Sequence, residues 1–567
     1  MNAGSTRSEL QANFGTAVDD DAIMTECVEM CRIFNIKGED LFYKWEAFSF
    51  NSGSNRRLRL LDLEGARALR AHIQRDLANK TEQARRKTLG GTTIGGNMFN
   101  RSGLGRPSKP MGAMQGVAKI VKTEPTESQA TAALTSIPEV DIKAPDASMS
   151  SRYRYMFQKL STRSEALDAR IEEFGEIVRE SYGIEELGDP AATTDDSVVI
   201  VGRIVCDADA KLNEASLLIE SSRMSGGGVR VPLRFDPQFT IRGGSPDISL
   251  FPGMIVALKG QNGGAGAFVI SEVLPLPLLP NTPSSFQGRR NPFSVVVASG
   301  PFTPDNDAEL HFKPLITFLS ELPHQPDRPS VVILTGPFID ASHPSIREGD
   351  LSLTPIAMFR KYISTPLTAF YKTCPSTLIL LIPSVRDIIS SHFVFPQGPL
   401  DIERLSLPPT VRVLPNPCNF VINGVRFGVS TVDLLIQVRK EEFIKRVEGQ
   451  SAKSRDAMLE LCRTILSQRS FYPIFPSPKE FSSITNLDLS HPELLEFLDP
   501  TSGTAKSPDV LIIPSVLKQF RKVVGETTFI NPSTMMKGCT AFIKAVPSTE
   551  ADGKHLIEVE IKKVTGT

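Results

Sequence analysis

The pattern of hydrophobic positions changes several times along the chain and divides it into segments of different structure. In the first segment, apolar side chains recur at helical spacing in three stretches, residues 20–34, 39–50 and 63–77. Acidic residues precede the first stretch, where they favour a helix start. Trp45, the only tryptophan, falls on the apolar side of the second stretch and is expected in a core. The pattern therefore predicts a small all-α N-terminal module over residues 1–78.

Residues 79–150 show no hydrophobic periodicity. Residues 80–122 hold nine Lys or Arg and one acidic residue, a net charge of +8, and eight glycines lie within residues 90–116. Such a composition cannot bury enough apolar surface to fold by itself. We predict a disordered, basic, Gly-rich linker, and its composition leaves open whether it contacts DNA or is only a solvated tether.

Helical periodicity returns over residues 151–194, which we expect to form a helical connector. Five short β-rich runs then follow, separated by Gly or Asn turns, at residues 197–206, 215–220, 229–235, 254–260 and 267–274. Five short strands in so short a stretch are typical of an OB-type β-barrel. We place this barrel at residues 195–283.

From residue 284 to residue 567, continuous apolar runs alternate with longer helical stretches. The runs at 295–299, 331–335, 378–382, 427–431 and 510–513 are apolar throughout, as expected of strands covered on both faces. Helices are expected between them, for example at 309–321, 357–372, 456–468 and 491–498, where Ser490 and Glu493 suggest a capping box. The segment therefore predicts an α/β layered domain, in which ligands bind beyond the carboxyl ends of the strands.

Those strand ends carry Ser, Gly and Pro where catalytic side chains would be expected. They read Ser299-Gly300-Pro301, Thr335-Gly336-Pro337, Pro383-Ser384-Val385, Ser430-Thr431-Val432-Asp433 and Pro514-Ser515-Val516. A metal centre needs several carboxylates and imidazoles that converge. The nearest candidate ligands are Asp340, His343, Asp387, His392 and Asp433. The alternative interpretation is that Asp340 shapes a turn and the histidines lie on the surface.

Composition and missing motifs narrow the function further. The chain has 63 Lys and Arg against 64 Asp and Glu, which argues against a surface built throughout for nucleic acid. The barrel segment has four Phe, no Tyr or Trp, and seven basic against nine acidic residues, which makes a poor platform for single strands. Phosphate-loop, dinucleotide and nucleophile-elbow motifs are missing, and no apolar run approaches the roughly 18 residues of a membrane span. We expect no enzyme activity, no cofactor, no metal and no membrane partner.

Five sequence motifs resemble the B subunits of DNA polymerase alpha-primase. They are VVVASGPFTPDND (295–307), VVILTGPFIDASHP (331–344), LILLIPSVRD (378–387), LPNPCNF (414–420) and FINPSTMMKG (529–538). In that family an OB barrel precedes a domain similar to calcineurin-like metallophosphoesterases. The resemblance is strong over residues 195–547 and looser over residues 20–78.

The resemblance also implies which residues mark a vestigial, catalytically inactive phosphoesterase site. Active phosphoesterases carry DxH, GDxxD, GN(H/D) and GHxH blocks at these strand ends. In this chain the matching positions are Ser299 and Pro301, then Gly336, Pro337 and Asp340, then Ser384 and Asp387, and finally Ser515. Only the glycine and last aspartate of GDxxD are kept, and Pro337, at the bridging position, cannot hold a metal.

The resemblance further implies a noncatalytic subunit that works in the nucleus at the initiation of DNA replication. It implies that the barrel and the phosphoesterase-like domain bind the zinc-bearing C-terminal domain of the polymerase catalytic subunit, with primase in the same complex. The N-terminal module would dock other replication proteins, and DNA contact would be weak or indirect. Two alternatives stay open: a phosphoesterase with a remodelled metal site, and a single-stranded DNA-binding OB protein.

Overall fold

The computed structural model describes most of the chain outside the predicted linker. The described residues are 3–18, 20–34, 36, 38–52, 61, 63, 65–70, 140–144 and 157–563, the last range with gaps at 209, 265, 281–290, 308–309, 326–327, 350, 450–455 and 548–554. They belong to two compact units, Met1–Pro125 and Thr126–Thr567. Residues 79–139 and 145–150 of the predicted linker lie outside the described part.

The first unit is built from helices that share one hydrophobic core. Its helices are α1 (Ala3–Phe14), α2 (Asp21–Phe34) and α3 (Gly38–Ser52), and residues 65–70 are also helical. Trp45 is only 6 % exposed and packs in this core, as expected from its spacing. Helix α1 was not predicted, because its sequence AGSTRSELQANF has few large apolar residues and therefore no visible stripe.

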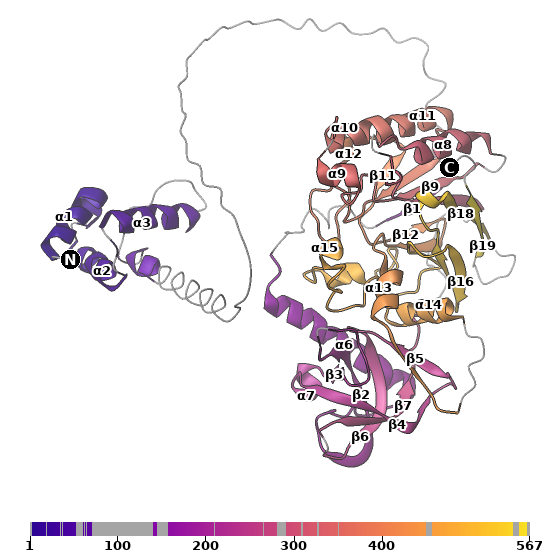
Figure 1. The fold of residues 1–567 in the computed structure, drawn as a ribbon, viewed down its shortest axis with the longest axis horizontal. Helices are drawn as coiled ribbons and strands as arrows, with labels where there is room; N and C mark the ends of the chain where they lie inside the picture. Colours follow the sequence, from indigo (N-terminus) through magenta and orange to yellow (C-terminus); the bar gives the residue numbers. More distant parts are fainter. Residues whose placement is uncertain are drawn as a thin grey trace, which may run out of the picture. The chain divides into compact units, whose positions relative to one another are not determined.

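The second unit contains two six-stranded sheets (Figure 1). One sheet has the order β11-β10-β9-β8-β18-β19, with bounds Val411–Val413, Leu378–Ile382, Val331–Thr335, Phe293–Ser299, Cys539–Pro547 and His555–Lys563. The other has the order β1-β12-β13-β15-β17-β16, with bounds Ile142–Lys143, Cys418–Ile422, Val425–Val429, Val510–Ile512, Thr527–Asn531 and Phe520–Val524. All five apolar runs are strands, but three lie in the first sheet and two in the second.

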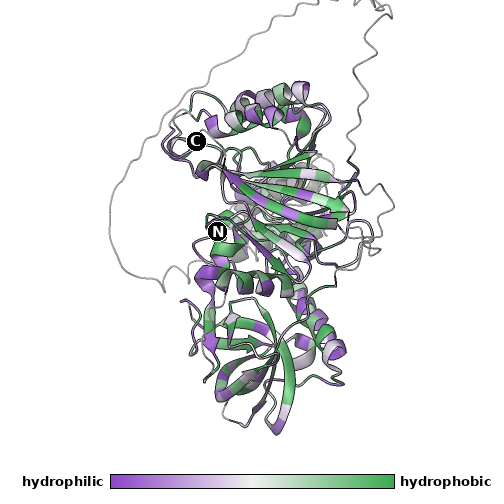
Figure 2. Cartoon of the chain, turned by 90° about the vertical axis from the view of Figure 1, so that its right-hand side faces the viewer, coloured by the Kyte–Doolittle hydropathy of each residue, from purple (hydrophilic) through white to green (hydrophobic). Residues whose placement is uncertain are grey.

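The two sheets pack face to face, and helices cover their outer sides (Figure 1). Helices α8 (Lys313–Glu321), α10 (Pro355–Phe359) and α11 (Thr365–Thr373) cover the first sheet. Helices α13 (Leu434–Glu441) and α14 (Ala457–Ser467) cover the second. Alternate residues of each central strand face the other sheet and the helices, so these strands are mostly hydrophobic in Figure 2.

Two of the expected helices differ from the prediction. The stretch 357–372 is helical but contains a π-helical turn, Arg360–Ser364. The stretch 491–498 forms only a 3₁₀ turn, Pro492–Leu495, and its N-cap residue His491 makes no side-chain capping bond, so the predicted capping box is wrong. A capping motif fixes a helix start only where the following residues can stack into further turns.

The barrel is closed and has the five expected strands. They are β2 (Thr194–Cys206), β3 (Leu217–Glu220), β4 (Arg230–Ile241), β7 (Phe268–Leu274) and β6 (Ile255–Asn262), paired in that order. Helix α6 (Leu160–Tyr182) packs on β2 and β6, and it ends at Gly183, which has a φ of 63° that favours glycine. The described part of the predicted connector is therefore a helix bound to the barrel.

A short strand corrects the predicted extent of the linker. Within residues 79–150, β1 (Ile142–Lys143) pairs with β12 at the edge of the second sheet. The Asn423 side chain accepts the Asp141 N–H at 2.9 Å, and the Asn423 N–H donates to the Asp141 carbonyl at 3.0 Å. Residues 140–144 are therefore part of the second unit, because they complete a sheet edge whose partner strand lies some 280 residues later.

Candidate functional site

The first two strand ends of the β8-β9-β10 sheet are packed against each other. The hydroxyl of Thr335 donates to that of Ser299 at 2.8 Å, and both residues are fully buried. A Cβ on Gly300 would lie 2.0 Å from the Pro337 carbonyl oxygen. Only glycine fits at this contact, so the two loops that follow β8 and β9 close directly on each other and leave no room between them for a catalytic group.

Asp387 is the most deeply buried carboxylate at these ends. It accepts the N–H groups of Ile339 at 3.0 Å and Ser384 at 2.8 Å, and also that of Phe338. Burial raises its pKa to about 7, although the three N–H donors act in the opposite direction. A Cβ on Gly336 would lie 2.3 Å from a carboxylate oxygen of Asp387. Asp387 therefore ties the loop after β10 to the loop after β9.

Asp340 is held by an arginine that the sequence pattern did not single out. Arg386 binds both carboxylate oxygens, with Nε at 3.1 Å from Oδ1, and one of its terminal nitrogens also donates to the Ser342 hydroxyl at 2.8 Å. The N–H and the hydroxyl of Ser342 donate to Asp340 as well. Asp340 therefore shapes the turn before Pro344, as the alternative interpretation held.

The strand ends of the second sheet are connected in a similar way. Asp433 caps α13 by accepting the Ile436 N–H at 3.1 Å, and its other oxygen accepts the Val516 N–H at 2.8 Å. Burial raises the pKa of Asp433, while a hydrogen bond from Ser515 acts to lower it. The N–H of Ser515 donates to Asn531 at 2.9 Å. These side chains fix the loops that follow β13 and β15.

The candidate metal ligands do not fit a metal centre. His392 is exposed, but His343 is buried, so the expectation that both lie on the surface is wrong for His343. The Nε2 atom of His343 lies 3.2 Å from the Pro304 carbonyl oxygen. Among the described residues, no three His, Cys, Asp or Glu side chains are grouped so that they could hold an ion. The carboxylates of Asp340 and Asp387 accept hydrogen bonds from protein donors.

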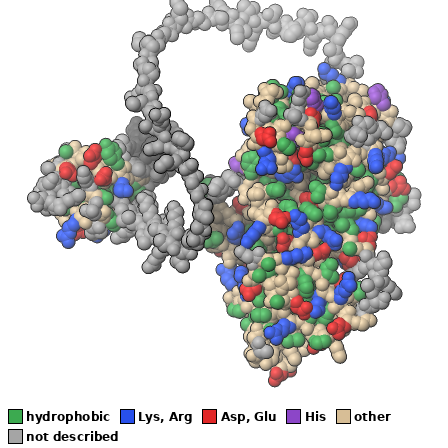
Figure 3. Space-filling view, viewed as in Figure 1, with side chains coloured by type: hydrophobic (Ala, Val, Ile, Leu, Met, Phe, Trp, Pro, Cys, Tyr) green, Lys and Arg blue, Asp and Glu red, His purple; other side chains and the backbone are tan. Residues whose placement is uncertain are grey.

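The barrel does not offer the stacking surface that single strands require. Phe239, Phe251 and Phe268 are fully buried, and Phe235 lies against Phe239 with ring centroids 4.8 Å apart. The face of the molecule seen in Figure 3 mixes basic, acidic and apolar side chains and shows no continuous basic stripe among the described residues. These observations weigh against the single-strand-binding alternative.

One continuous core joins the barrel to the α/β part. It contains barrel residues such as Ile204 and Phe268 together with Leu435, Ile465 and Phe529 of the α/β part. Strand β5 (Asp247–Leu250), which was not predicted, leaves the barrel and pairs with β14 (Phe443–Arg446). Such pairing between segments about 200 residues apart makes the two parts a single body.

Gln468 extends this connection with hydrogen bonds. Its amide accepts the Ile255 N–H at 2.8 Å and donates to the Ile255 carbonyl at 2.9 Å, and its side chain is completely buried. A Cβ on Gly253 would lie 2.1 Å from the Phe475 nitrogen, so the two chain segments touch through their backbones. Gln468 was not found from the sequence, because its role depends on a contact 213 positions away.

Comparison with known proteins places the chain among polymerase subunits. Three family models match: that of the B subunits of DNA polymerases alpha and epsilon (residues 295–522), that of the OB domain of the DNA polymerase alpha B subunit (164–276), and that of its N-terminal region (6–65). A putative 5′-nucleotidase from Staphylococcus aureus aligns structurally at 14 % identity over 48 % of this chain and 54 % of its own, with a TM-score of 0.24. No helix among the described residues is long and apolar enough to cross a membrane.

Two curated relatives carry the same name. The DNA polymerase alpha B subunit of Schizosaccharomyces pombe is 33 % identical over 92 % of both chains. That of Saccharomyces cerevisiae is 32 % identical over 68 % of this chain and 58 % of its own. Because one relative aligns along almost the entire length, and the barrel and the α/β part each match a family model, the chain belongs to the family of DNA polymerase alpha B subunits.

Proposed function

We propose that the chain acts as the noncatalytic B subunit of a DNA polymerase alpha-primase complex and supports the initiation of DNA replication in the nucleus. As a member of this family, the chain is an accessory subunit and not itself an enzyme. The observation that carries the proposal is the alignment with a polymerase alpha B subunit along 92 % of both chains. The similarity therefore extends over both units and is not limited to one shared domain.

We further propose that the barrel and the α/β part together bind the zinc-bearing C-terminal domain of the catalytic subunit. The common core and the Gln468 amide hold the two parts at a fixed angle, so a partner can contact both without an ordering cost. Primase would be present in the same complex. The helices of the first unit would dock other replication proteins. The predicted linker would leave this module free to bind them separately from the second unit, because a long flexible linker imposes little fixed geometry.

The strand ends are proposed to be a vestigial phosphoesterase site without activity. This part of the proposal concerns Ser299, Pro301, Gly336, Pro337, Asp340, Ser384, Asp387 and Ser515. It is supported by the polar groups of Ser299, Asp340, Ser384, Asp387 and Ser515, which make hydrogen bonds within and between the loops. The test is bound-metal analysis of the purified chain together with hydrolysis of bis-p-nitrophenyl phosphate. Stoichiometric manganese or zinc, with turnover lost in Asp340→Ala, would instead establish the remodelled phosphoesterase.

The complex itself is tested by affinity purification of the tagged full-length chain from nuclear extract. We expect the polymerase alpha catalytic subunit and both primase subunits to elute in equal amounts with it. A chain that elutes alone, or with a different polymerase, would contradict the proposal.

A further inference from the structure

A cavity of about 310 Å³ lies between α6, the barrel and residues 470–496. Its walls are mainly apolar, with Leu167 from α6 and Phe475, Leu489 and Leu495 from the α/β part. This volume is sufficient for one large side chain and its neighbours in a bound peptide. None of the strand-end residues discussed above lines the cavity, so it is separate from the vestigial site.

Arg170 and Arg203 line this cavity, and Arg163 and Arg469 lie near the same two aromatic rings as they do. The guanidinium groups of Arg163 and Arg203 lie 5.7 and 5.6 Å from the ring centre of Phe475, and those of Arg170 and Arg469 lie 5.4 and 5.7 Å from that of Phe174. Two of these arginines also donate to backbone carbonyls, Arg170 to that of Gln468 and Arg469 to that of Pro277 at 3.1 Å.

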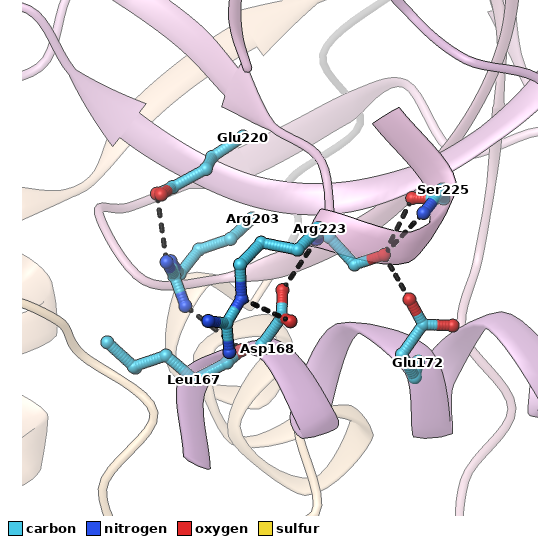
Figure 4. Close-up of polar contacts among 8 residues, drawn as sticks. Leu167, Asp168, Glu172, Arg203, Glu220, Arg223 and Ser225 are labelled. Carbon is cyan, nitrogen blue, oxygen red and sulfur yellow. Dashed lines mark hydrogen bonds and ion pairs between the residues drawn. The ribbon is translucent and has the colours of Figure 1, made fainter. Parts of the chain in front are cut away.

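Some nitrogen atoms of these arginine side chains have no hydrogen-bond acceptor among the described residues. Arg203 donates to the Leu167 carbonyl at 3.1 Å and to Glu220 at 2.8 Å (Figure 4), but its Nε is buried without a partner. The Nε atoms of Arg163 and Arg469 are also buried and unpaired, and so is the amide nitrogen of Gln158 just before α6. A buried donor that stays without an acceptor destabilises the fold.

The charges around the cavity are also incompletely balanced. Glu173 and Glu496 line it and interact with Arg170, and Glu220 is bound to Arg203. The neighbouring acids of α6 are used elsewhere, because Asp168 binds Arg223 and Glu172 accepts from Ser222 on the barrel side of the helix (Figure 4). Arg163 has no carboxylate partner in the described chain. The local surplus is therefore of hydrogen-bond donors and of one positive charge.

We propose that this cavity docks a segment of a partner protein that carries an acidic side chain next to a large apolar one. The apolar side chain fills the cavity, and the carboxylate pairs with Arg163, which lies beside Phe475 of the cavity wall. Leu160 (83 % exposed), the first residue of α6, and Phe157 (68 %), which precedes the helix, are further exposed apolar side chains. Nucleic acid is a poor occupant, because Glu173 and Glu496 would repel its phosphates. This docking does not depend on the complex proposed above.

The probe is a library of random twelve-residue peptides displayed on phage and selected on the immobilised full-length chain. We expect enrichment of peptides with Asp or Glu beside Leu, Phe or Trp, and we would measure their affinity by fluorescence anisotropy. Arg163→Gln should weaken binding about tenfold through loss of one charged hydrogen bond. Ala169→Leu, which places a larger side chain in the cavity wall, should also weaken it. Arg179→Gln is the matched control, because Arg179 lies on the same helix and pairs with exposed Glu176.

Thermal unfolding shows whether each variant keeps its fold, and only folded variants are compared. The proposal is wrong if no peptide is enriched over the bare support, or if the enriched peptides are neutral or basic. It is also wrong if the selected peptides bind Arg163→Gln and Ala169→Leu as tightly as the unchanged chain. Binding of a twenty-nucleotide oligothymidylate that Arg163→Gln abolishes would assign the surface to nucleic acid instead.

Discussion

Replacing Gln468 with alanine tests whether the barrel and the α/β part form one body. The substitution removes the amide that accepts from the Ile255 N–H and donates to the Ile255 carbonyl, and all of these groups lie in the interior. Each orphaned backbone group costs about 1–3 kcal/mol, so we expect a loss of about 2–6 kcal/mol in the free energy of unfolding. Water that enters the space left by the amide would bring the loss to the lower end of this range.

Two measurements on the full-length chain report this loss. Urea unfolding gives the change in the free energy of the second unit, and hydrogen exchange of the β6 peptide shows whether the Ile255 amide opens more often. Gln261→Ala is the control, because Gln261 lies on the same strand with an exposed side chain and should change stability by less than about 0.5 kcal/mol. A loss below about 1 kcal/mol for Gln468→Ala, with unchanged exchange at Ile255, would refute the reasoning.

Three further outcomes follow from the strand ends and the linker. Because the pKa of Asp387 is raised to about 7 in the folded chain, the folded state holds a proton between about pH 4 and 7 that the unfolded state has lost. The free energy of unfolding should therefore fall by up to about 1.4 kcal/mol per pH unit across this window. In urea titrations Asp387→Asn should remove this slope, and an unchanged slope would rule out Asp387 as its source. Gly336→Ala should lower the melting temperature strongly, because the added Cβ would lie 2.3 Å from an Asp387 oxygen. Gly263→Ala is the control, because its Cβ would meet open space, and equal melting temperatures for the two variants would contradict the close packing. Limited proteolysis, followed by mass spectrometry, should cut first within residues 80–139 and spare residues 140–144; early cleavage inside 140–144 would contradict the pairing of β1 with β12.

The sequence predicted those elements whose signal is local. The five apolar runs of the α/β part are strands, and the five β-rich runs after residue 195 close a barrel. Burial on both faces leaves a continuous apolar run, and burial on one face leaves an alternating pattern, so both signals are local. Trp45 is in a core for the same reason. The turn role of Asp340 was one of two interpretations that its position allowed, and the hydrogen bonds from Ser342 and Arg386 decide for it.

The remainder depends on contacts between distant parts of the chain. The sequence within each apolar run does not show to which of the two sheets the strand belongs, because strand pairing depends on residues far away along the chain. The same holds for β1, which has only two residues and pairs with β12, and for Arg386, which binds Asp340 across 46 positions. The capping signal at Ser490 failed because the chain forms a 3₁₀ turn in place of a helix.

The proposed binding body is tested most directly by reconstitution with the C-terminal domain of the polymerase alpha catalytic subunit. Residues 126–567, the second unit, would be co-expressed with that domain. The product would be analysed by size-exclusion chromatography at about 0.1 M and about 1 M salt. We expect a one-to-one complex at both salt concentrations, because a permanent subunit contact commonly buries about 2,000 Å² or more and is apolar at its centre. If only the full-length chain forms the complex, or if the complex dissociates at high salt, the proposed role of the barrel and the α/β part as the binding body is wrong.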